Sequence, residues 1–281
     1  MNNCLILDGK EVAQASIENL LVRVKKLRDF GRSPKLVAIL VGDDPASTTY
    51  VNMKERACHA LGIETEIKRL SKDTDTTELQ QIINDLNNDK TVDGILLQHP
   101  VPKQIDEIKC FNTISLEKDV DGVTTEGFGN MAMGLNAFGS CTPLGIMRLL
   151  NHYKINLEGT NALVVGRSQI LGKPMAAMLL NANATVTIAH SKTKDLKRSL
   201  NGFDLVVVAV GMPNFVSAKD LKVGSVLIDA GYHPAQKCGD VDMTNISNIV
   251  SAYTPVPGGV GPMTINTLMM NTIEAMEKKY G

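Results

Sequence analysis

A lysine and a tyrosine one helical turn apart are the first side chains in this sequence whose types could do chemistry. Tyr50 and Lys54 stand at positions i and i+4 of a predicted helix that begins near Ser47, its expected N-cap, so they share one helix face. A lysine amine desolvated beside an aromatic ring, at a domain edge, has a lowered pKa and can move protons near neutral pH. The alternative is a surface lysine lying across a tyrosine ring, which is the commoner arrangement of such a pair.

Other polar side chains follow a buried strand or flank a turn. Gln98 comes directly after the apolar run Gly94–Leu97, where its amide either faces a cleft or is satisfied by the adjacent loop. Asp119 and Asp121 precede Gly122 and either bond their own turn or accept two parallel N–H bonds from an amino-pyrimidine edge. Three further residues are interpreted as structural: Ser47, Cys58 and His99.

A glycine turn between an apolar run and a helix predicts a phosphate site. Leu163–Val165 is typical of a buried strand, Gly166 ends it where the backbone turns tightly, and Gly172 lets the next helix pack close to the sheet. Such a turn points backbone N–H groups and the positive end of a helix dipole at an anion, which favours phosphate. The spacing departs from G-x-G-x-x-G, so an ordinary βα turn is the alternative.

The residues after the next predicted strand indicate which nucleotide would bind. An acidic residue at this position accepts from a ribose hydroxyl but repels a 2′-phosphate. The predicted strand 184–189 is followed by His190-Ser191-Lys192 with no carboxylate, and Arg167 stands in the glycine turn itself. These residues favour NADP. The alternative is that Arg167 and Lys192 are solvated surface cations.

Alternating strands and helices must position these side chains. The alternation predicts a parallel sheet covered on both faces, first up to His99 and again from Ala162. Two α/β domains suggest a cleft, because open parallel sheets bind ligands beyond the carboxyl ends of their strands. Residues 117–141 are predicted to form a long loop or inter-domain crossing, and 254–262 a rigid glycine–proline loop before a helix from Thr264 to about Lys279.

The composition is that of an ordinary globular protein. Of 281 residues, 43% are hydrophobic and 21% charged, and a net charge of −1 gives no electrostatic reason to expect nucleic acid or an anionic membrane as a partner. Apolar runs such as Leu36–Val41 are too short to span a membrane, and the N-terminus lacks the pattern of a signal peptide. The five scattered cysteines favour reduced thiols in a cytosol, and the five dispersed histidines predict no protein-ligated metal.

Several stretches carry a family resemblance, in family order and over nearly the whole chain. The most specific is Thr-Pro-Val-Pro-Gly-Gly-Val-Gly-Pro-Met-Thr at Thr254–Thr264. The others are Tyr50-Val51-Asn52-Met53-Lys54, Asp93-Gly94-Ile95-Leu96-Leu97-Gln98, Lys118-Asp119-Val120-Asp121-Gly122, Cys141-Thr142-Pro143, Val165-Gly166-Arg167-Ser168 and Gly172-Lys173-Pro174. Together they resemble the bifunctional methylenetetrahydrofolate dehydrogenase/methenyltetrahydrofolate cyclohydrolases.

The resemblance implies a two-step reaction of one-carbon metabolism. Hydride would pass from methylenetetrahydrofolate to NADP, and water would then open the methenyl cation to 10-formyltetrahydrofolate. By the family pattern Lys54 is the central catalytic group, Gln98 tunes and positions it, Tyr50 stacks on the folate and Asp121 holds the pterin edge. The resemblance places the cofactor-binding residues at Gly166, Arg167, Ser168, Gly172 and Ser191, and further substrate contacts at Pro257, Gly258 and Gly259.

The resemblance also implies an architecture and an assembly. Residues 1–140 plus 264–281 would form the folate-binding domain, with the last helix folding back onto it, and residues 141–263 the Rossmann-type NADP-binding domain. A cytoplasmic homodimer acting on tetrahydrofolate derivatives, with one or more glutamates in the tail, is expected.

The sequence departs from the family pattern at three places: His99 for leucine, Ser140 for proline, and Val123–Gly129, which lacks the usual His-Pro and Asn. The last departure adjoins Asp121 and bears on the contact with the pterin. Two alternatives remain open. One is a monofunctional NAD-linked methylenetetrahydrofolate dehydrogenase, and the other is a non-catalytic dinucleotide-sensing module.

Overall fold

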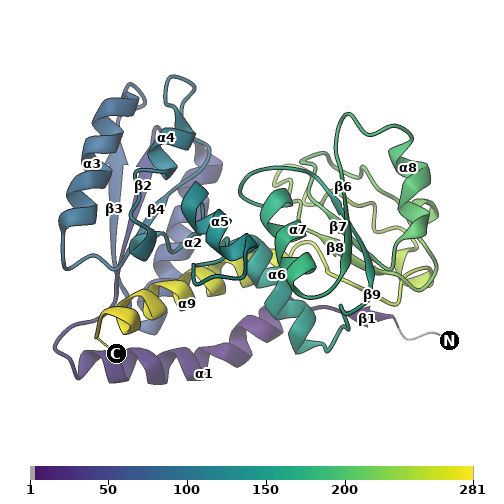
Figure 1. Ribbon diagram of the computed structural model, residues 1–281, viewed down its shortest axis with the longest axis horizontal. Coiled ribbons are helices and arrows are strands. Elements are labelled where there is room, and N and C mark those ends of the chain that lie inside the picture. The colour runs from purple at the N-terminus through teal and green to yellow at the C-terminus, as the bar shows by residue number, and fades with distance from the viewer. Residues whose placement is uncertain (1–3, 281) are drawn as a thin grey trace. The chain divides into compact units, whose positions relative to one another are not determined.

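The computed structural model describes residues 4–280, apart from the side chains of residues 198 and 199 (Figure 1). Contacts between Cα atoms divide the chain into two compact units, and both are discontinuous in sequence. Unit 1 comprises the described residues up to Gln14 together with Thr142–Thr264, and unit 2 comprises Ala15–Cys141 with the residues from Ile265 onward. Both units have the α/β architecture expected from the alternating sequence pattern.

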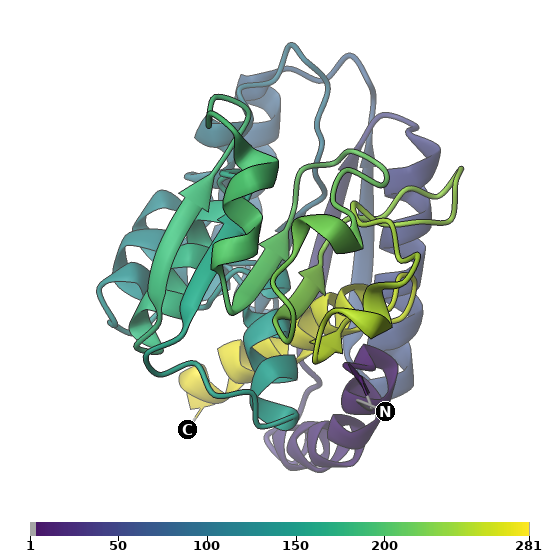
Figure 2. The ribbon, with the colours of Figure 1, turned by 90° about the vertical axis from the view of Figure 1, so that its right-hand side faces the viewer.

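Unit 1 contains a six-stranded sheet in the order β1-β9-β8-β7-β5-β6, with every neighbouring pair parallel. Alternate residues of its strands pack on opposite faces, as the two-residue period of a strand requires. Val164 and Val207 pack with helices α6 and α7, whereas Val165 and Val208 pack with Leu200 on the other face. The strands of this sheet lie side by side in Figure 2. The strands are β1 (Leu5–Ile6), β5 (Asn161–Val165), β6 (Thr185–Ala189), β7 (Leu205–Val208), β8 (Val226–Asp229) and β9 (Ala252–Tyr253). The helices are α6 (Cys141–His152), α7 (Gly172–Asn181), α8 (Leu196–Ser199) and the short 3-10 turns Leu200–Gly202, Ala218–Asp220 and Ile246–Asn248.

Unit 2 is built on a three-stranded parallel sheet in the order β3-β2-β4. The central strand β2 is buried over six of its seven residues, because helices cover both of its faces. The strands are β2 (Lys35–Val41), β3 (Glu64–Leu70) and β4 (Gly94–Leu97). The shorter helices are α2 (Pro45–Leu61), α3 (Thr76–Asn88), α4 (Glu107–Phe111), α5 (Thr125–Ala132) and the 3-10 turn Leu116–Lys118.

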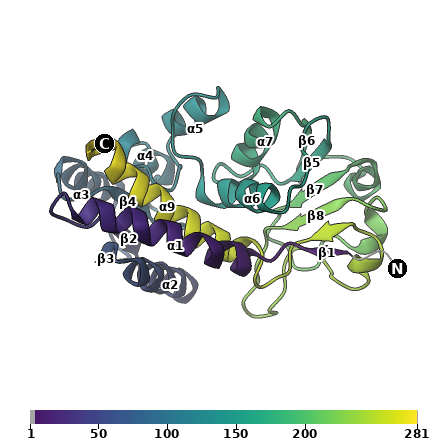
Figure 3. The same cartoon turned by 90° about the horizontal axis from the view of Figure 1, so that it is seen from below.

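Two long helices each contribute residues to both units. They are α1 (Gly9–Arg28) and α9 (Val260–Tyr280), and within unit 2 they lie side by side (Figure 3). The Arg23 guanidinium donates to both carboxylate oxygens of Glu277, at 2.9 and 2.6 Å, and the Ser16 hydroxyl donates to Asn266. These contacts attach the last helix of the chain to the first.

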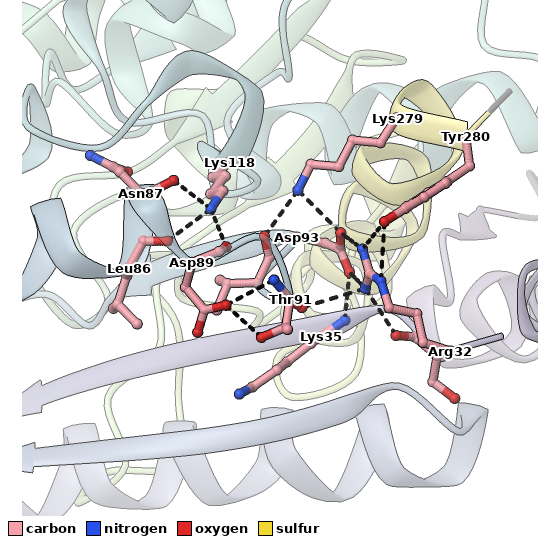
Figure 4. A network of polar contacts seen from close by, with 12 residues as sticks. Arg32, Lys35, Leu86, Asn87, Asp89, Thr91, Asp93, Lys118, Lys279 and Tyr280 are labelled. Carbon is pink, nitrogen blue, oxygen red and sulfur yellow. Dashed lines mark hydrogen bonds and ion pairs between the residues drawn. The ribbon is translucent and has the colours of Figure 1, made fainter. Parts of the chain in front are cut away.

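The C-terminal end of α9 is further held by a buried carboxylate (Figure 4). Asp93 is fully buried at the start of β4 and accepts two hydrogen bonds from the Arg32 guanidinium, at 2.6 and 2.7 Å. It also forms an ion pair with Lys279 at 3.2 Å. The backbone N–H of Lys35, at the start of β2, donates to the same carboxylate. One buried carboxylate thus joins two strands of the sheet to the final helix.

Several element boundaries differ from those expected from the sequence. Residues 117–141 contain helix α5, capped by Thr124, whose hydroxyl accepts from the Gly127 N–H. The glycines of this stretch hide the apolar periodicity by which a helix is recognised. Helix α9 begins at Val260 rather than Thr264, because Pro262 lies in its first turn, where the missing N–H costs nothing.

The first described residues join the six-stranded sheet. Strand β1 pairs in parallel with β9, through Leu5 with Ala252 and Ile6 with Tyr253, so residues 4–14 group with unit 1 by contact. A two-residue strand carries no periodicity that could reveal its partner.

Candidate active site

Helix α2 presents the lysine and the tyrosine singled out from the sequence. The helix is capped by Asp44, whose carboxylate accepts from the Ser47 N–H at 2.7 Å, so the expected capping role of Ser47 was wrong. Ser47 is buried within the first turn instead. Tyr50 and Lys54 follow one turn apart and are both half-buried. The cap and the preceding turn therefore fix where Lys54 emerges.

The end of strand β4 brings a glutamine to this lysine. Gln98 continues the sheet, because its N–H donates to the Ile39 carbonyl, and its side chain is only 8% exposed. The Lys54 ammonium donates to Gln98 Oε1 at 3.0 Å, and Gln98 Nε2 donates to the His99 carbonyl at 2.6 Å. Both ends of the amide are bonded, so its oxygen is held toward Lys54. The Lys54 ammonium is therefore a donor held at a fixed position in a half-buried site.

The two aspartates of the following turn have different partners. Asp119 is 1% exposed and accepts from the N–H groups of Val123 and Thr124 at 3.0 and 2.9 Å, which makes it the turn-forming residue. Burial raises its pKa to about 6, against the opposing effect of these hydrogen bonds.

Asp121 is the aspartate whose carboxyl group interacts electrostatically with the lysine. Burial raises the pKa of its carboxyl group, and the charges of Lys54 and His99 oppose that rise. The structure therefore brings Lys54, Gln98 and Asp121 together, with Tyr50 on the same helix as the lysine. An amine, an amide and a carboxyl group in one half-buried site can bind a polar ring and transfer protons.

His99 is an additional charged neighbour that the sequence did not identify. Its Nδ1 lies 2.6 Å from a Glu107 carboxylate oxygen, and this partner raises the pKa of His99. Glu107 lies at the start of α4, a short helix whose signal is too brief to predict from periodicity.

In unit 1 the turn after β5 requires glycine at the two positions expected from the sequence. Gly166 has a φ of +130°, and a Cβ there would collide with the Ala209 carbonyl, so only glycine fits. A Cβ at Gly172 would likewise meet the backbone of Gly166, as expected where a helix packs close to a turn. Between them, Ser168 accepts from the Gly172 N–H at 3.2 Å, and the Arg167 and Ser168 side chains are exposed.

Ser191 lies at the same edge of the sheet as this turn. Val165 pairs with Ala189, and the Gly166 N–H donates to the Ala189 carbonyl at 2.8 Å, so the ends of β5 and β6 are level. Ser191 follows in a turn closed by the Thr193 N–H and the His190 carbonyl, and its side chain is exposed. Arg167, Ser168 and Ser191 therefore follow strand ends that lie at the same edge of the sheet.

Two buried carboxylates, missed in the sequence, shape the neighbouring loops of unit 1. Asp240 accepts from the N–H groups of Val210 and Gly211 at 2.7 and 2.9 Å, directly after β7, and its other oxygen lies 2.9 Å from His233. Asp229, at the end of β8, accepts from three backbone N–H groups, and burial raises its pKa to about 6. These loops stand at the carboxyl edge of the sheet.

The glycine–proline loop packs against the start of α1. The Lys10 N–H donates to the Gly258 carbonyl at 3.1 Å, and the Gly259 N–H donates to the Pro255 carbonyl at 2.8 Å. A Cβ at Gly9 would collide with the Gly259 carbonyl. Pro257, Gly258 and Gly259 thus belong to unit 1, with the glycine turn.

Among residues 4–280, no three His, Cys, Asp or Glu side chains are grouped so that they could hold a metal ion. No helix in the same range has the length and apolar character needed to cross a membrane.

The fold and the two groups of residues define a class: an α/β enzyme with a nucleotide-binding unit and a separate unit carrying a lysine-centred site. Two family models match the chain. The catalytic domain of tetrahydrofolate dehydrogenase/cyclohydrolase matches residues 7–121, and the NAD(P)-binding domain of the same enzymes matches residues 140–280. The chain therefore belongs to the tetrahydrofolate dehydrogenase/cyclohydrolase family.

Relatives resemble the chain over its whole length. The bifunctional protein FolD of Alcanivorax borkumensis is 56% identical over 98% of this chain and 99% of its own, and that of Teredinibacter turnerae is 57% identical over 99% of both. The crystal structure of the bifunctional FolD of Campylobacter jejuni superposes with a TM-score of 0.95 at 42% identity, covering 98% of this chain and 99% of that one. A Trypanosoma brucei dehydrogenase-cyclohydrolase, solved with NADP and an inhibitor, gives 0.94 at 31% identity, covering 100% of this chain and 99% of that one.

Proposed function

We propose that this protein is a bifunctional enzyme of one-carbon metabolism that oxidises 5,10-methylenetetrahydrofolate with NADP and hydrolyses the 5,10-methenyl product to 10-formyltetrahydrofolate. Membership of the family and the full-length likeness to FolD proteins support both activities. The observation that carries the proposal is the 3.0 Å hydrogen bond between Lys54 and Gln98, with the carboxyl group of Asp121 as their neighbour.

The nucleotide would be held by the carboxyl edge of the unit 1 sheet. NADP supplies the hydride acceptor for the first step. The close approach of Gly166 and Gly172 leaves room for a phosphate at the turn, and Ser168 and Ser191 offer hydroxyl groups. Arg167 supplies an exposed cation suited to the 2′-phosphate. The residues directly after β6, His190-Ser191-Lys192, include no carboxylate that would repel this phosphate.

The folate would be held by residues of unit 2. Asp121 would accept N–H bonds from the amino-pyrimidine edge of the pterin, and Tyr50 would stack on the ring. Binding the ring in one orientation removes the entropy cost of bringing the reacting carbon to the nucleotide.

Hydrolysis requires that protons leave the attacking water and the adduct. Lys54 is the group placed to accept and return them, because Gln98 holds its nitrogen from one side and a carboxyl group lies nearby. Addition of water to the methenyl carbon forms a C–O bond, cleavage of one C–N bond then gives the formyl group, and one proton is released overall. The amide of Gln98 stabilises the charged lysine between turnovers without itself exchanging a proton.

Family membership also supports a homodimer in the cytoplasm as the working form. Size-exclusion chromatography with light scattering on the purified protein would distinguish a dimer from a monomer of 30.4 kDa.

The assignment is tested by one experiment with both substrates and both nucleotides. Purified protein given methylenetetrahydrofolate should form NADPH from NADP at a higher kcat/KM than NADH from NAD, and should separately consume methenyltetrahydrofolate without nucleotide. Oxidation with NAD preferred and no hydrolysis would instead identify a monofunctional NAD-linked dehydrogenase. Nucleotide binding with neither activity would identify a sensing module.

A further inference from the structure

Helix α9 carries a buried amide that contacts the backbone on both sides of the Asp121 turn. The Asn271 side chain is 1% exposed, and its Nδ2 donates to the Val120 carbonyl at 2.8 Å, directly before Asp121. The same nitrogen lies 3.4 Å from the Gly139 carbonyl and 3.7 Å from Cys141 Sγ. One amide therefore joins the 119–122 turn to the 139–141 segment.

The two segments also bond each other around Asp121. The Ser140 hydroxyl donates to the Gly122 carbonyl at 2.6 Å, the Cys141 N–H donates to the Asp121 carbonyl at 3.2 Å, and the Cys141 thiol donates to the Val120 carbonyl at 3.3 Å. Gly122 has a φ of +66°, and a Cβ there would collide with the backbone of Ser140. We call this arrangement, formed by residues 119–122, 139–141 and Asn271, the Asp121 clasp.

The clasp is anchored to rigid elements at both of its ends. The Lys118 side chain, 2% exposed, donates to three backbone carbonyls at the end of α3, those of Leu86, Asn87 and Asp89, at 2.7–2.8 Å (Figure 4). On the other side, α9 is held by the Asp93 carboxylate through Lys279 and by Arg23 through Glu277. Asn271 is thus a fixed point against which the turn is held.

An apolar residue would fill the Asn271 position at lower cost if packing were its only task. Asparagine has a low helix propensity, and a buried amide is unfavourable unless it is hydrogen-bonded. The bonds that it makes here lead to the turn that carries Asp121 and to the 139–141 segment, which is bonded to that turn. We infer that Asn271 is a positioning residue for Asp121, and that Ser140 assists it from the opposite segment. This inference rests on the folate-binding role proposed for Asp121.

The role of the clasp is tested through the Michaelis constants of the two substrates. In Asn271→Leu the donor is lost while the volume is nearly kept, so the KM for methylenetetrahydrofolate and for methenyltetrahydrofolate should rise about tenfold. The KM for NADP should stay unchanged, because the nucleotide residues belong to unit 1. Thr272→Val is the matched control: Thr272 is equally buried on the same helix, but its hydroxyl bonds the Leu268 carbonyl within that helix. Its folate KM values should equal those of the wild type.

Two further variants keep the test decisive. Ser140→Ala removes the hydrogen bond to Gly122 from a loop position, so it gives a readout even where Asn271→Leu fails to fold. It should raise both folate KM values by about threefold. Adding Asn271→Leu to Asp121→Asn should raise the folate KM no further than Asp121→Asn alone, since both changes act through one carboxyl group.

The outcomes separate the inference from the function on which it rests. If Asp121→Asn raises the folate KM and the Asn271 and Ser140 variants do not, the positioning role is wrong and the proposed function stands. If Asp121→Asn leaves the folate KM unchanged, the role proposed for Asp121 is wrong and the positioning role falls with it. A lower kcat with all KM values unchanged would identify Asn271 as a residue needed only for stability.

Discussion

At the end of β5 the Arg167 and Ser168 side chains are exposed, whereas at the end of β4 the Gln98 side chain is buried and bonded at both ends. In unit 1 the shape of the site is fixed by backbone, above all by Gly166, and the side chains that would touch the ligand extend into solvent. In unit 2 the side chains themselves are held by other side chains. Binding a nucleotide by its phosphates needs a backbone surface and flexible cations, but transferring a proton needs a group held at one distance.

Both units nevertheless form their turns with a buried carboxylate. Asp119 and Asp229 each accept backbone N–H groups, and burial raises the pKa of both to about 6. The difference between the units therefore lies in the groups that would meet the ligands, and substitutions in each unit should act on different measurements.

The largest effect is expected from Lys54→Met. Methionine keeps the length of the side chain but cannot carry a proton, so hydrolysis of methenyltetrahydrofolate should fall by about 10²–10⁴-fold. NADP binding, followed by fluorescence titration, should be unchanged because its residues belong to unit 1. Lys68→Met, which removes an exposed ion pair with Glu66, is the control and should retain activity. A fully active Lys54→Met enzyme would remove Lys54 from its proposed role.

Gly166→Ala should instead act on unit 1 and on its binding of the nucleotide. The added Cβ meets the Ala209 carbonyl at a φ of +130°, so we expect a loss of about 3 kcal/mol or more in the stability of unit 1, and loss of NADP binding. Gly202→Ala is the control in the same unit, since nothing lies within 4 Å of a Cβ there. Chemical denaturation and NADP titration measure both effects. Normal NADP affinity in Gly166→Ala would show that the turn does not form the site.

Arg167→Ala tests whether the exposed cation selects the nucleotide. Loss of a charged hydrogen bond should weaken the binding of NADP by about 10–100-fold and leave the binding of NAD nearly unaffected. Lys222→Ala is the control, because Lys222 pairs with Asp204 at the amino end of the strands, opposite to the turn. Equal weakening of the two nucleotides, measured by titration, would contradict a contact with the 2′-phosphate.

The smallest effect is expected in the pH dependence of stability. A carboxyl group with a pKa of about 6 in the folded state and 3.8 unfolded is ionised first in the unfolded chain, so its contribution to stability falls as the pH rises from about 4 to 6. The unfolding free energy of the wild type relative to Asp119→Asn should therefore drop by about 2 kcal/mol across that range.

Asp106 is the control for this measurement, because its pKa is shifted in the opposite direction. The Lys109 N–H lowers the pKa of the exposed Asp106, so its stabilisation is lost only below its usual pKa. The difference in unfolding free energy between the wild type and Asp106→Asn should be nearly constant above pH 4. If the difference between the wild type and Asp119→Asn instead rose with pH, the hydrogen bonds to Asp119 would affect its pKa more than its burial does.

Local patterns allowed much of this to be predicted from the sequence. The strand and helix alternation predicted parallel sheets, and the spacing of Gly166 and Gly172 predicted the turn that the structure contains. The helical spacing of Tyr50 and Lys54 placed them on one helix. The roles of these residues, and the cleft expected between two domains, stay predictions.

The features that were missed depend on contacts between distant residues. Asn271 meets the Val120 carbonyl across 151 positions of the chain, and no local pattern contains that information. Asp44 and Ser47 are both good capping residues three positions apart, so only the folded geometry decides between them. Asp229 and Asp240 belong to no recognisable sequence motif, because their carboxylates accept hydrogen bonds from the backbone of loops.

The discontinuity of both units has a consequence for biosynthesis. Unit 2 is completed by residues from Ile265 onward, which leave the ribosome after every residue of unit 1. Until then Asp93 lacks Lys279, Arg23 lacks Glu277, and the turn around Asp121 lacks Asn271. We therefore expect unit 1 to be the first to reach its final form on a nascent chain, although most of unit 2 is made earlier. Lys54 would acquire its finished surroundings only once the residues from Ile265 onward have been made.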